Sequence, residues 1–409
     1  MINLVNRRVG LAAFIAFAVS AASPAVRAGD RHDDGDDNRY VVTNLVSDIP
    51  IKGMNPTIDP HLKNAWGVTF SPGASPFWIS DNAAGLATLY DGDGTIVPVV
   101  VTIPCPPTPP GAGQGSSCPP NTVPPIIAAP TGTVWNPTTA GFLVPNTTPP
   151  APSRFIFATE DGTISAWASG SAATIAVNNA IIPNATNGAV YKGLAVGVNV
   201  NGVTVNGGTS PTFVFLYATN FRAGTIDVFD AGFNQVTPGT PGKIDGNFTD
   251  ADIPFGYAPF GIQNINGDLF VTYAKQNGVN HDDVAGAGNG FVDVFDTDGH
   301  LLRRFASRGA LNSPWGVARA SQAFGRFSGD ILVGNFGDGR INAFDSDGNF
   351  LGQLRDTNGK PISIDGLWTL TLGGGAKSSQ DTMYFTAGPH GETDGLFGTI
   401  TPAQDIDDN

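Results

Sequence analysis

The chain is poor in cysteine and in positive charge. Its 409 residues include 2 cysteines and 21 Lys and Arg against 35 Asp and Glu, which gives a formal net charge of −14. So few cysteines exclude a disulfide-dense scaffold and a structural zinc site built mainly of thiolates. The acidic balance disfavours polyanionic partners, so we expect no nucleic acid and no anionic membrane surface as a partner.

Signatures of several enzyme classes are also missing. The sequence has no Gly-x-Ser-x-Gly elbow, no His-Glu-x-x-His, no P-loop and no Cys-x-x-Cys. The glycine-rich stretch 286–290 opens a strand-like segment and not a helix, which excludes a dinucleotide fingerprint there. No useful length of sequence has helical periodicity, while the 53 glycines favour short strands and many turns.

What the sequence does contain is a repeated strand. Residues 290–299 alternate apolar and polar side chains and end in an Asp-x-Asp-Gly turn, as expected for a strand with one buried face. Further copies of this segment, which match it to different degrees, occur at 85–94, 162–167, 224–230, 339–348 and 395–400. Two more apolar runs precede each copy, and the first of them carries a glycine at Gly67, Gly132, Gly193, Gly261, Gly316 and Gly366.

These repeats predict an all-β fold, a six-bladed β-propeller. Each unit has three strands and a more variable fourth, and four antiparallel strands repeated radially form a propeller. The sixth unit runs out of chain after its third strand, while Tyr40–Val46 has strand composition and no partner nearby. We therefore predict that this N-terminal strand pairs with the last blade and closes the ring, making 40–403 a single domain.

The segments on either side of the predicted propeller have the composition of an export signal and of flexible, solvent-exposed tails. Residues 1–28 have the pattern of an export signal, with Arg7 and Arg8 before an apolar run that is short for a membrane span. Residues 29–39 form an acidic, flexible leader, for which cation binding is the alternative, and 404–409 form an acidic tail. We expect a periplasmic or secreted monomer with no membrane span after cleavage.

Residues 104–130 form a Pro- and Gly-rich loop inserted in the propeller, and both cysteines lie in it. In an exported protein, Cys105 and Cys118 are expected to form a disulfide, worth about 3 kcal/mol for a loop of this size. A metal-ligand pair and two free thiols are the alternatives.

Topology brings one set of polar residues to one end of the channel. The turn after each second strand lies at the same end as the connection between blades. Asp81, Glu160, Asn220 and Asn335 follow second strands, and such oxygen donors would suit Ca²⁺. As ligand-binding candidates near this mouth the sequence offers Lys192, Lys275, His281, His390 and Asn64. The alternative is that the Asn and Asp are turn residues and that the lysines form salt bridges with an acidic rim.

The repeat unit resembles the NHL-type propeller repeat. Stretches 64–68, 191–195, 271–276, 281–286, 290–296 and 388–398 also resemble a family of exported bacterial six-bladed propellers without an established activity. More distantly, the chain is similar to calcium-dependent lactonase and phosphotriesterase propellers. That likeness implies an ion held by Glu160, Asn220 and Asn335, with Asp81 as a fourth ligand.

Two functions follow from this reading. The first is an exported binding or interaction module that takes an unknown small molecule or protein at one face of the ring. The alternative is a metal-dependent hydrolase or lyase, with calcium as the expected ion, at the mouth of the channel. The sequence identifies no catalytic residue.

Overall fold

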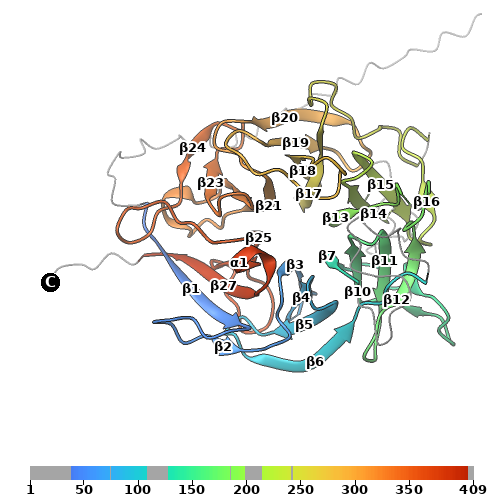
Figure 1. Cartoon of the computed structure of the whole chain (residues 1–409), viewed down its shortest axis with the longest axis horizontal. Helices are drawn as coiled ribbons and strands as arrows, with labels where there is room; N and C mark the ends of the chain where they lie inside the picture. The colour runs from blue at the N-terminus through green and yellow to red at the C-terminus, as the bar shows by residue number, and fades with distance from the viewer. Residues whose placement is uncertain are drawn as a thin grey trace, which may run out of the picture. The chain divides into compact units, whose positions relative to one another are not determined.

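The computed structural model describes residues 38–73, 75–107, 128–184, 186–198, 214–240 and 243–403. Their strands form five sheets of 4 strands, one of 5 strands and a small pair, arranged as a ring of six blades (Figure 1). The prediction of an all-β six-bladed β-propeller is confirmed. The predicted signal and acidic tail lie outside the described residues, as do Cys118 and nearly all of the acidic leader and the inserted loop.

The innermost strands of blades one to six surround the axis. They are β3 (Ala65–Thr69), β7 (Pro130–Trp135), β13 (Tyr191–Val198), β17 (Tyr257–Ile265), β21 (Pro314–Arg319) and β25 (Leu367–Leu372). Each contacts the innermost strand of the next blade, and β25 contacts β3, so the ring is closed.

The second and third strands of each blade follow the predicted apolar runs. The second strands are β4 (Phe77–Asp81), β10 (Phe155–Thr159), β14 (Val214–Asn220), β18 (Asp268–Lys275), β22 (Ile331–Asn335) and β26 (Met383–Ala387). The third strands are β5 (Leu86–Tyr90), β11 (Thr163–Trp167), β15 (Thr225–Asp230), β19 (Phe291–Phe295), β23 (Ile341–Phe344) and β27 (Leu396–Pro402).

The outermost strands vary most in length. They are β6 (Ile96–Thr102), β12 (Thr174–Asn178), β16 (Gln235–Val236), β20 (Leu301–Ser307), β24 (Phe350–Gln353) and, in blade six, β1 (Tyr40–Ser47). Minor elements are β2 (Thr57–Ile58), β8 (Leu143–Val144), β9 (Ala151–Pro152), a 3-10 turn at Gly325–Phe327 and α1 (Pro389–Glu392). No helix among the described residues is long and apolar enough to cross a membrane.

The N-terminal strand closes the ring as predicted. β1 pairs antiparallel with β27, from Tyr40 opposite Pro402 to Ser47 opposite Leu396. The Tyr40 ring is buried and stacks on Phe324 with centroids 5.0 Å apart, and its hydroxyl donates to the Phe324 carbonyl. The edge of blade six is thereby paired, which removes the exposed strand that an open ring would present.

Each innermost strand contains one extra residue relative to its partner strand, a β-bulge near the axis. In five blades the predicted glycine follows the residue that the bulge turns toward the axis, and it lies against the next blade. A Cβ on Gly261, for example, would meet the Trp315 carbonyl oxygen at 2.1 Å. Blade six differs from the prediction: Gly366 precedes β25, and Thr369 occupies the position and donates to the Trp66 carbonyl.

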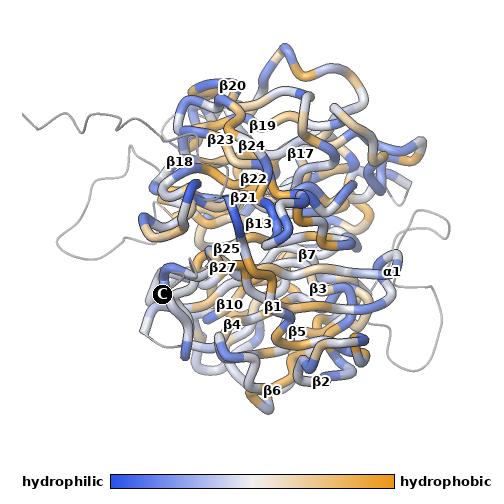
Figure 2. Tube along the Cα trace, turned by 90° about the vertical axis from the view of Figure 1, so that its left-hand side faces the viewer, coloured by the Kyte–Doolittle hydropathy of each residue, from blue (hydrophilic) through white to orange (hydrophobic). Residues whose placement is uncertain are grey.

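Aromatic rings close the channel at one level. Trp66, Trp315 and Trp368 pack with Phe221 and Phe260 into a buried cluster, and the rings of Trp66 and Trp368 stack with centroids 3.5 Å apart. The space among the innermost strands beside these rings, lined by Gly67, is a cavity of only about 20 Å³. The channel is therefore not an open pore, and the cluster forms an aromatic floor beneath the channel mouth. In an edge view α1 lies at one end of the ring (Figure 2).

Candidate functional site

Seven polar side chains from five blades form a hydrogen-bonded network above the aromatic floor, which we call the polar girdle. Its members are Asn64, Asn82, Glu160, Lys192, His281, Asp282 and Glu392. Blade one supplies Asn64 and Asn82, and blades two and three supply Glu160 and Lys192. Blade four supplies His281 and Asp282, and blade six supplies Glu392.

The girdle is continuous across one side of the mouth. The Asn64 amide donates to the Glu392 carboxylate at 2.8 Å and to the Asn82 oxygen at 3.1 Å. Asn82 donates in turn to Glu160 at 3.0 Å. The indole N–H of Trp368 donates to the Asn64 oxygen at 3.0 Å, so the aromatic floor also holds the network in place.

Lys192 is the centre of the girdle. It is the bulge residue of β13, and the other blades place Trp66, Thr131, Phe260, Trp315 and Trp368 at this position. A bulge re-aims its side chain, here toward the axis. The lysine side chain is only 3% exposed, and a buried ammonium needs compensating charge.

Two carboxylates and two rings compensate the Lys192 charge. The ammonium bonds to Glu160 and lies 3.3 Å from an oxygen of Asp282. It lies 5.3 Å from the Trp66 ring centroid and 5.9 Å from that of Phe221, within the range of cation–π attraction. Burial alone would lower the pKa of Lys192, but the charges of Glu160 and Asp282 outweigh it and raise that pKa. The residue is therefore a permanent cation.

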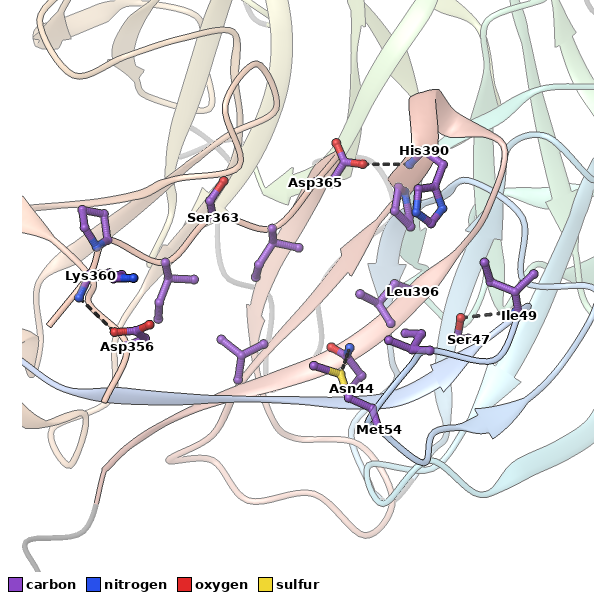
Figure 3. Close-up of a pocket in the computed structure, with 16 residues that line it drawn as sticks. Asn44, Ser47, Ile49, Met54, Asp356, Lys360, Ser363, Asp365, His390 and Leu396 are labelled. Atoms are coloured by element: carbon purple, nitrogen blue, oxygen red, sulfur yellow. Dashed lines mark hydrogen bonds between the residues drawn. The ribbon is translucent and has the colours of Figure 1, made fainter. Parts of the chain in front are cut away.

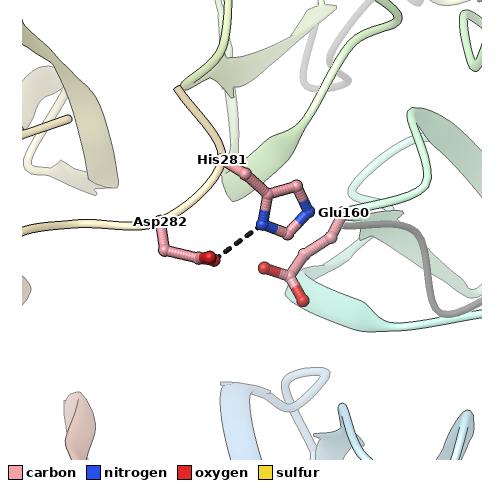
Figure 4. A group of neighbouring side chains, drawn as sticks. All are labelled: Glu160, His281 and Asp282. Atoms are coloured by element: carbon pink, nitrogen blue, oxygen red, sulfur yellow. Dashed lines mark hydrogen bonds and ion pairs between the residues drawn. The ribbon is translucent and has the colours of Figure 1, made fainter. Parts of the chain in front are cut away.

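His281 and Asp282 reach the girdle from the long loop between β18 and β19. The imidazole Nδ1 lies 2.7 Å from Asp282 Oδ1, and Figure 4 shows this edge of the ring directed at the carboxylate. The histidine side chain is 6% exposed, and its Nε2 has no hydrogen-bond partner among the described residues. Possible ligand atoms of Glu160, His281 and Asp282 all lie within 4.8 Å of one another.

This trio could hold a metal ion. One imidazole nitrogen with two carboxylates suits a transition metal such as Zn²⁺ or Mn²⁺ better than Ca²⁺, which prefers oxygen ligands alone. The Lys192 ammonium rests on the same two carboxylates. A metal ion could therefore bind only in competition with Lys192. The girdle is thus a candidate site either for a metal ion or for an ammonium group.

The carboxyl groups of the mouth differ in charge state. Burial raises the pKa of Asp282, but the hydrogen bond from His281 and the charge of Lys192 outweigh it and hold that pKa well below its usual value. Burial and the neighbouring Glu160 charge raise the pKa of Glu392 to about 7. Burial also raises the pKa of the adjacent Asp283. Four carboxyl groups thus lie near one ammonium, and the two with raised pKa values, Glu392 and Asp283, hold their protons more tightly than an ordinary carboxyl group does.

The structure brings four of the nine predicted site residues into the girdle: Glu160, Lys192, His281 and Asn64. Lys275 is exposed, and His390 lies on α1 with its Nδ1 2.7 Å from Asp394. The other three have places within their own blades.

Asp81, Asn220 and Asn335 end second strands as predicted, but they are not members of the girdle. Asn220 accepts from the backbone N–H of Val190, and Asn335 accepts from that of Asn312, so each amide secures the connection entering its blade. Asp81 is fully buried, and burial raises its pKa far above the usual range. Their expected convergence with Glu160 on one ion is therefore not found in this arrangement.

Asn82, Asp282 and Glu392 belong to the girdle although the sequence did not single them out. Each is within two residues of a predicted candidate, Asp81, His281 or His390. In a tight turn, neighbouring side chains point in different directions, so the choice between them depends on backbone angles. Glu392 shows this, since it follows two residues, His390 and Gly391, that also have positive φ.

The fold and the girdle define a six-bladed propeller with a buried polar site at its channel mouth. The chain is 32% identical over 351 residues to uncharacterized protein R648 of Acanthamoeba polyphaga mimivirus, covering 85% of this chain and 77% of that protein. It therefore belongs to the same family as that protein. Uncharacterized protein L690 of the same virus is 37% identical over 218 residues, 53% of each chain. No family model matches.

Among solved structures, a gluconolactonase from Xanthomonas campestris has a TM-score of 0.46 and 13% identity, covering 84% of this chain and 87% of its own. Virginiamycin B lyase from Staphylococcus aureus has a TM-score of 0.45 and 13% identity, covering 89% and 100%. Likenesses of this size assign no activity to the chain. The sequence relatives named above are viral, and they give no support to the predicted bacterial, exported origin.

Proposed function

We propose that this protein is a binding module and that its polar girdle takes a ligand with a cationic group. The observation that carries the proposal is the place of Lys192. Where four other blades carry an aromatic side chain, blade three buries an ammonium between Glu160 and Asp282 on an aromatic floor. The mouth of the ring is thus built to hold positive charge.

The remaining negative charge faces the side from which a ligand would come. The Asp282 side chain is 59% exposed although its neighbours Lys192 and His281 are buried. Glu392 is half-buried and has a pKa of about 7, so close to neutral pH a cation beside it would favour its charged form. Exposed charge of one sign attracts ligands of the opposite sign. An organic ammonium group would pair with the exposed Asp282 carboxylate and leave Lys192 in place.

A metal-dependent hydrolase or lyase is the second candidate, and the Glu160, His281 and Asp282 trio favours it. A metal ion there would act as a Lewis acid toward a carbonyl or similar group. Glu392, with its pKa of about 7, could hold or release a proton near neutral pH, as a general acid or base must. In this reading the ion displaces Lys192 from the carboxylates, and Zn²⁺ or Mn²⁺ fits the donors better than the calcium expected from the sequence.

Calorimetry with the full chain tests the first proposal. Butylammonium and spermidine are titrated beside butanol and butyrate, all at low salt. Binding of the amines alone, weakened by Glu160→Gln or Asp282→Asn, supports a cation site at the girdle. Asp347→Asn makes the same change of charge on an exposed outer turn and should have no effect. Equal heats for amine, alcohol and carboxylate would overturn the proposal.

Elemental analysis and melting curves test the second candidate, the metal-dependent enzyme. Purified protein is measured as isolated, after chelation, and after addition of Zn²⁺, Mn²⁺ or Ca²⁺. One tightly held ion per chain whose stabilising effect is lost in His281→Ala favours the metal-dependent enzyme. Melting curves indifferent to chelator and to all three ions remove it.

A further inference from the structure

A second cavity lies away from the girdle, where blades five and six meet the closing strand. It has a volume of about 550 Å³ and is lined by parts of β1, the segment after it, residues 356–365, α1 and the start of β27 (Figure 3). None of its lining residues belongs to the girdle. Cavities of about 300–1,000 Å³ are typical of small-molecule sites.

The body of this cavity is apolar. Its apolar lining residues are Val42, Ile49, Ile51, Met54, Pro361, Ile362, Ile364, Pro389 and Leu396. Met54 is 56% exposed, and a flexible thioether at the rim can adapt to the shape of a ligand. The ring closure creates this lining, because Val42 belongs to β1 and Leu396 to its partner β27.

The charged groups lie in two separate places on the cavity, one at Asp356 and Lys360 and one at Asp365 and His390, while Asn44 and Ser47 lie on the side of β1 (Figure 3). At one end the Asp356 carboxylate accepts the backbone N–H of Lys360, whose side chain places a positive charge nearby. At the other end Asp365 is exposed and accepts the backbone N–H of His390 at 2.8 Å. His390 faces Asp394, so the imidazole is directed toward a carboxylate of its own loop. Asp365 is thus an exposed carboxylate among the lining residues, and it forms no ion pair with another described residue.

The backbone of α1 is held in an unusual shape at this place. His390, Gly391 and Glu392 all have positive φ, which is costly for the two residues with side chains. The contacts of these residues fix the shape from both sides: Asp365 and Asp394 hold His390, and Asn64 holds Glu392. Asp365 and His390 therefore lie at the rim of the cavity. They give it a polar end whose position is fixed, next to the apolar residues that line the rest.

We propose that this cavity binds an amphipathic amine, with its apolar chain over Ile362, Ile364 and Leu396 and its ammonium group at Asp365. The apolar lining excludes a fully polar ligand. The charge at Asp365 selects an ammonium head over a carboxylate, because like charges at such an end repel. None of the lining residues belongs to the girdle, so the proposal stands whichever ligand the girdle takes.

Calorimetry with decylammonium, decanol and decanoate below their micelle concentrations tests the site on the full chain. With excess butylammonium present to occupy the girdle, decylammonium should bind with one equivalent per chain, and Asp365→Asn should weaken that binding roughly five-fold, since the amide keeps the His390 contact but loses the charge. Val42→Phe should narrow the apolar part of the cavity and weaken binding. Melting curves of both variants show whether they remain folded. Asp347→Asn, on an exposed outer turn, should leave this binding unchanged, and butylammonium, which lacks the long chain, should not compete for it.

Several results would overturn the proposal. They are several equivalents of decylammonium per chain, decanoate binding as tightly as decylammonium, and full binding by a folded Val42→Phe protein. Loss of decylammonium binding in Asp282→Asn but not in Val42→Phe would place the amine at the girdle instead. If Val42→Phe does not fold, Met54→Lys at the exposed rim replaces it and should weaken binding of the ammonium at least as much as Asp365→Asn, because it adds a like charge.

Discussion

Lys192 and Trp66 occupy equivalent positions in two different blades, and the Lys192 ammonium lies 5.3 Å from the centroid of the Trp66 ring. One substitution in a repeated aromatic position thus places a cation over the floor formed by the others. Glu160 and Asp282 then compensate its burial. The relationship links the repeat architecture directly to the proposed site.

We expect Lys192→Ala to destabilise the protein and small amines to restore it. Removing one partner from a buried charge network costs about 3–5 kcal/mol, because the other charges stay uncompensated. Ethylammonium can enter the space left by the side chain, while ethanol carries no charge to offer. Melting curves should therefore rise with ethylammonium in the variant and hardly at all in the parent chain.

Lys275→Ala, which removes an exposed lysine after a second strand, is the control and should melt like the parent chain. A Lys192→Ala protein that ignores ethylammonium would mean that the girdle does not recognise an external cation.

Truncating Tyr40 should loosen the closure of the ring. The side chain is 1% exposed, stacks on Phe324 and Phe327 and donates to a carbonyl, so Tyr40→Ala should cost about 3–5 kcal/mol of unfolding free energy. Val41 is its neighbour on the same strand and is 41% exposed, and Val41→Ala should cost far less. Denaturant titrations of the two variants decide this, and equal losses would contradict closure through the Tyr40 face.

Close packing at the axis predicts that Gly261→Ala is destabilising. The added Cβ would lie 2.1 Å from the Trp315 carbonyl oxygen, and relieving such overlap costs about 1–3 kcal/mol or more. Gly278→Ala adds the same atom in the long loop, where nothing lies within 4 Å, and should be nearly neutral. The pair is compared by melting temperature. A neutral Gly261→Ala would show that the innermost strands are farther apart than described.

Glu392 predicts a dependence of stability on pH. Its folded pKa of about 7 exceeds the ordinary value of 4.5, so the folded state binds the proton more tightly. This contribution is present below pH 4.5 and is lost as pH rises through about 7, because the unfolded chain ionises first. Denaturant titrations at several pH values in this window should show that Glu392→Gln loses less stability with rising pH than the parent chain.

Other carboxyl groups with raised pKa values, such as Asp283, contribute in both proteins and cancel in the comparison. Identical pH dependence in the two proteins would remove Glu392 from the set of groups that titrate near neutral pH.

Much of the fold follows from local sequence patterns. Alternating apolar residues and Asp-x-Asp-Gly turns determine strands and reversals over a few residues, and their recurrence determines the number of blades. Closure by Tyr40–Val46 follows from a count, since the last unit lacks a fourth strand. These features depend on neighbours along the chain, which is why the sequence alone was sufficient for them.

The site depends on contacts between residues far apart in the chain. Lys192, Glu160 and Asp282 meet because a bulge turns one side chain inward and two loops from different blades reach it. The sequence placed Asn220 and Asn335 at the correct end of their strands, but their amides are used by nearby backbone N–H groups. Which polar side chain faces the axis is decided by backbone angles and by competing hydrogen bonds, and only the tertiary structure sets both.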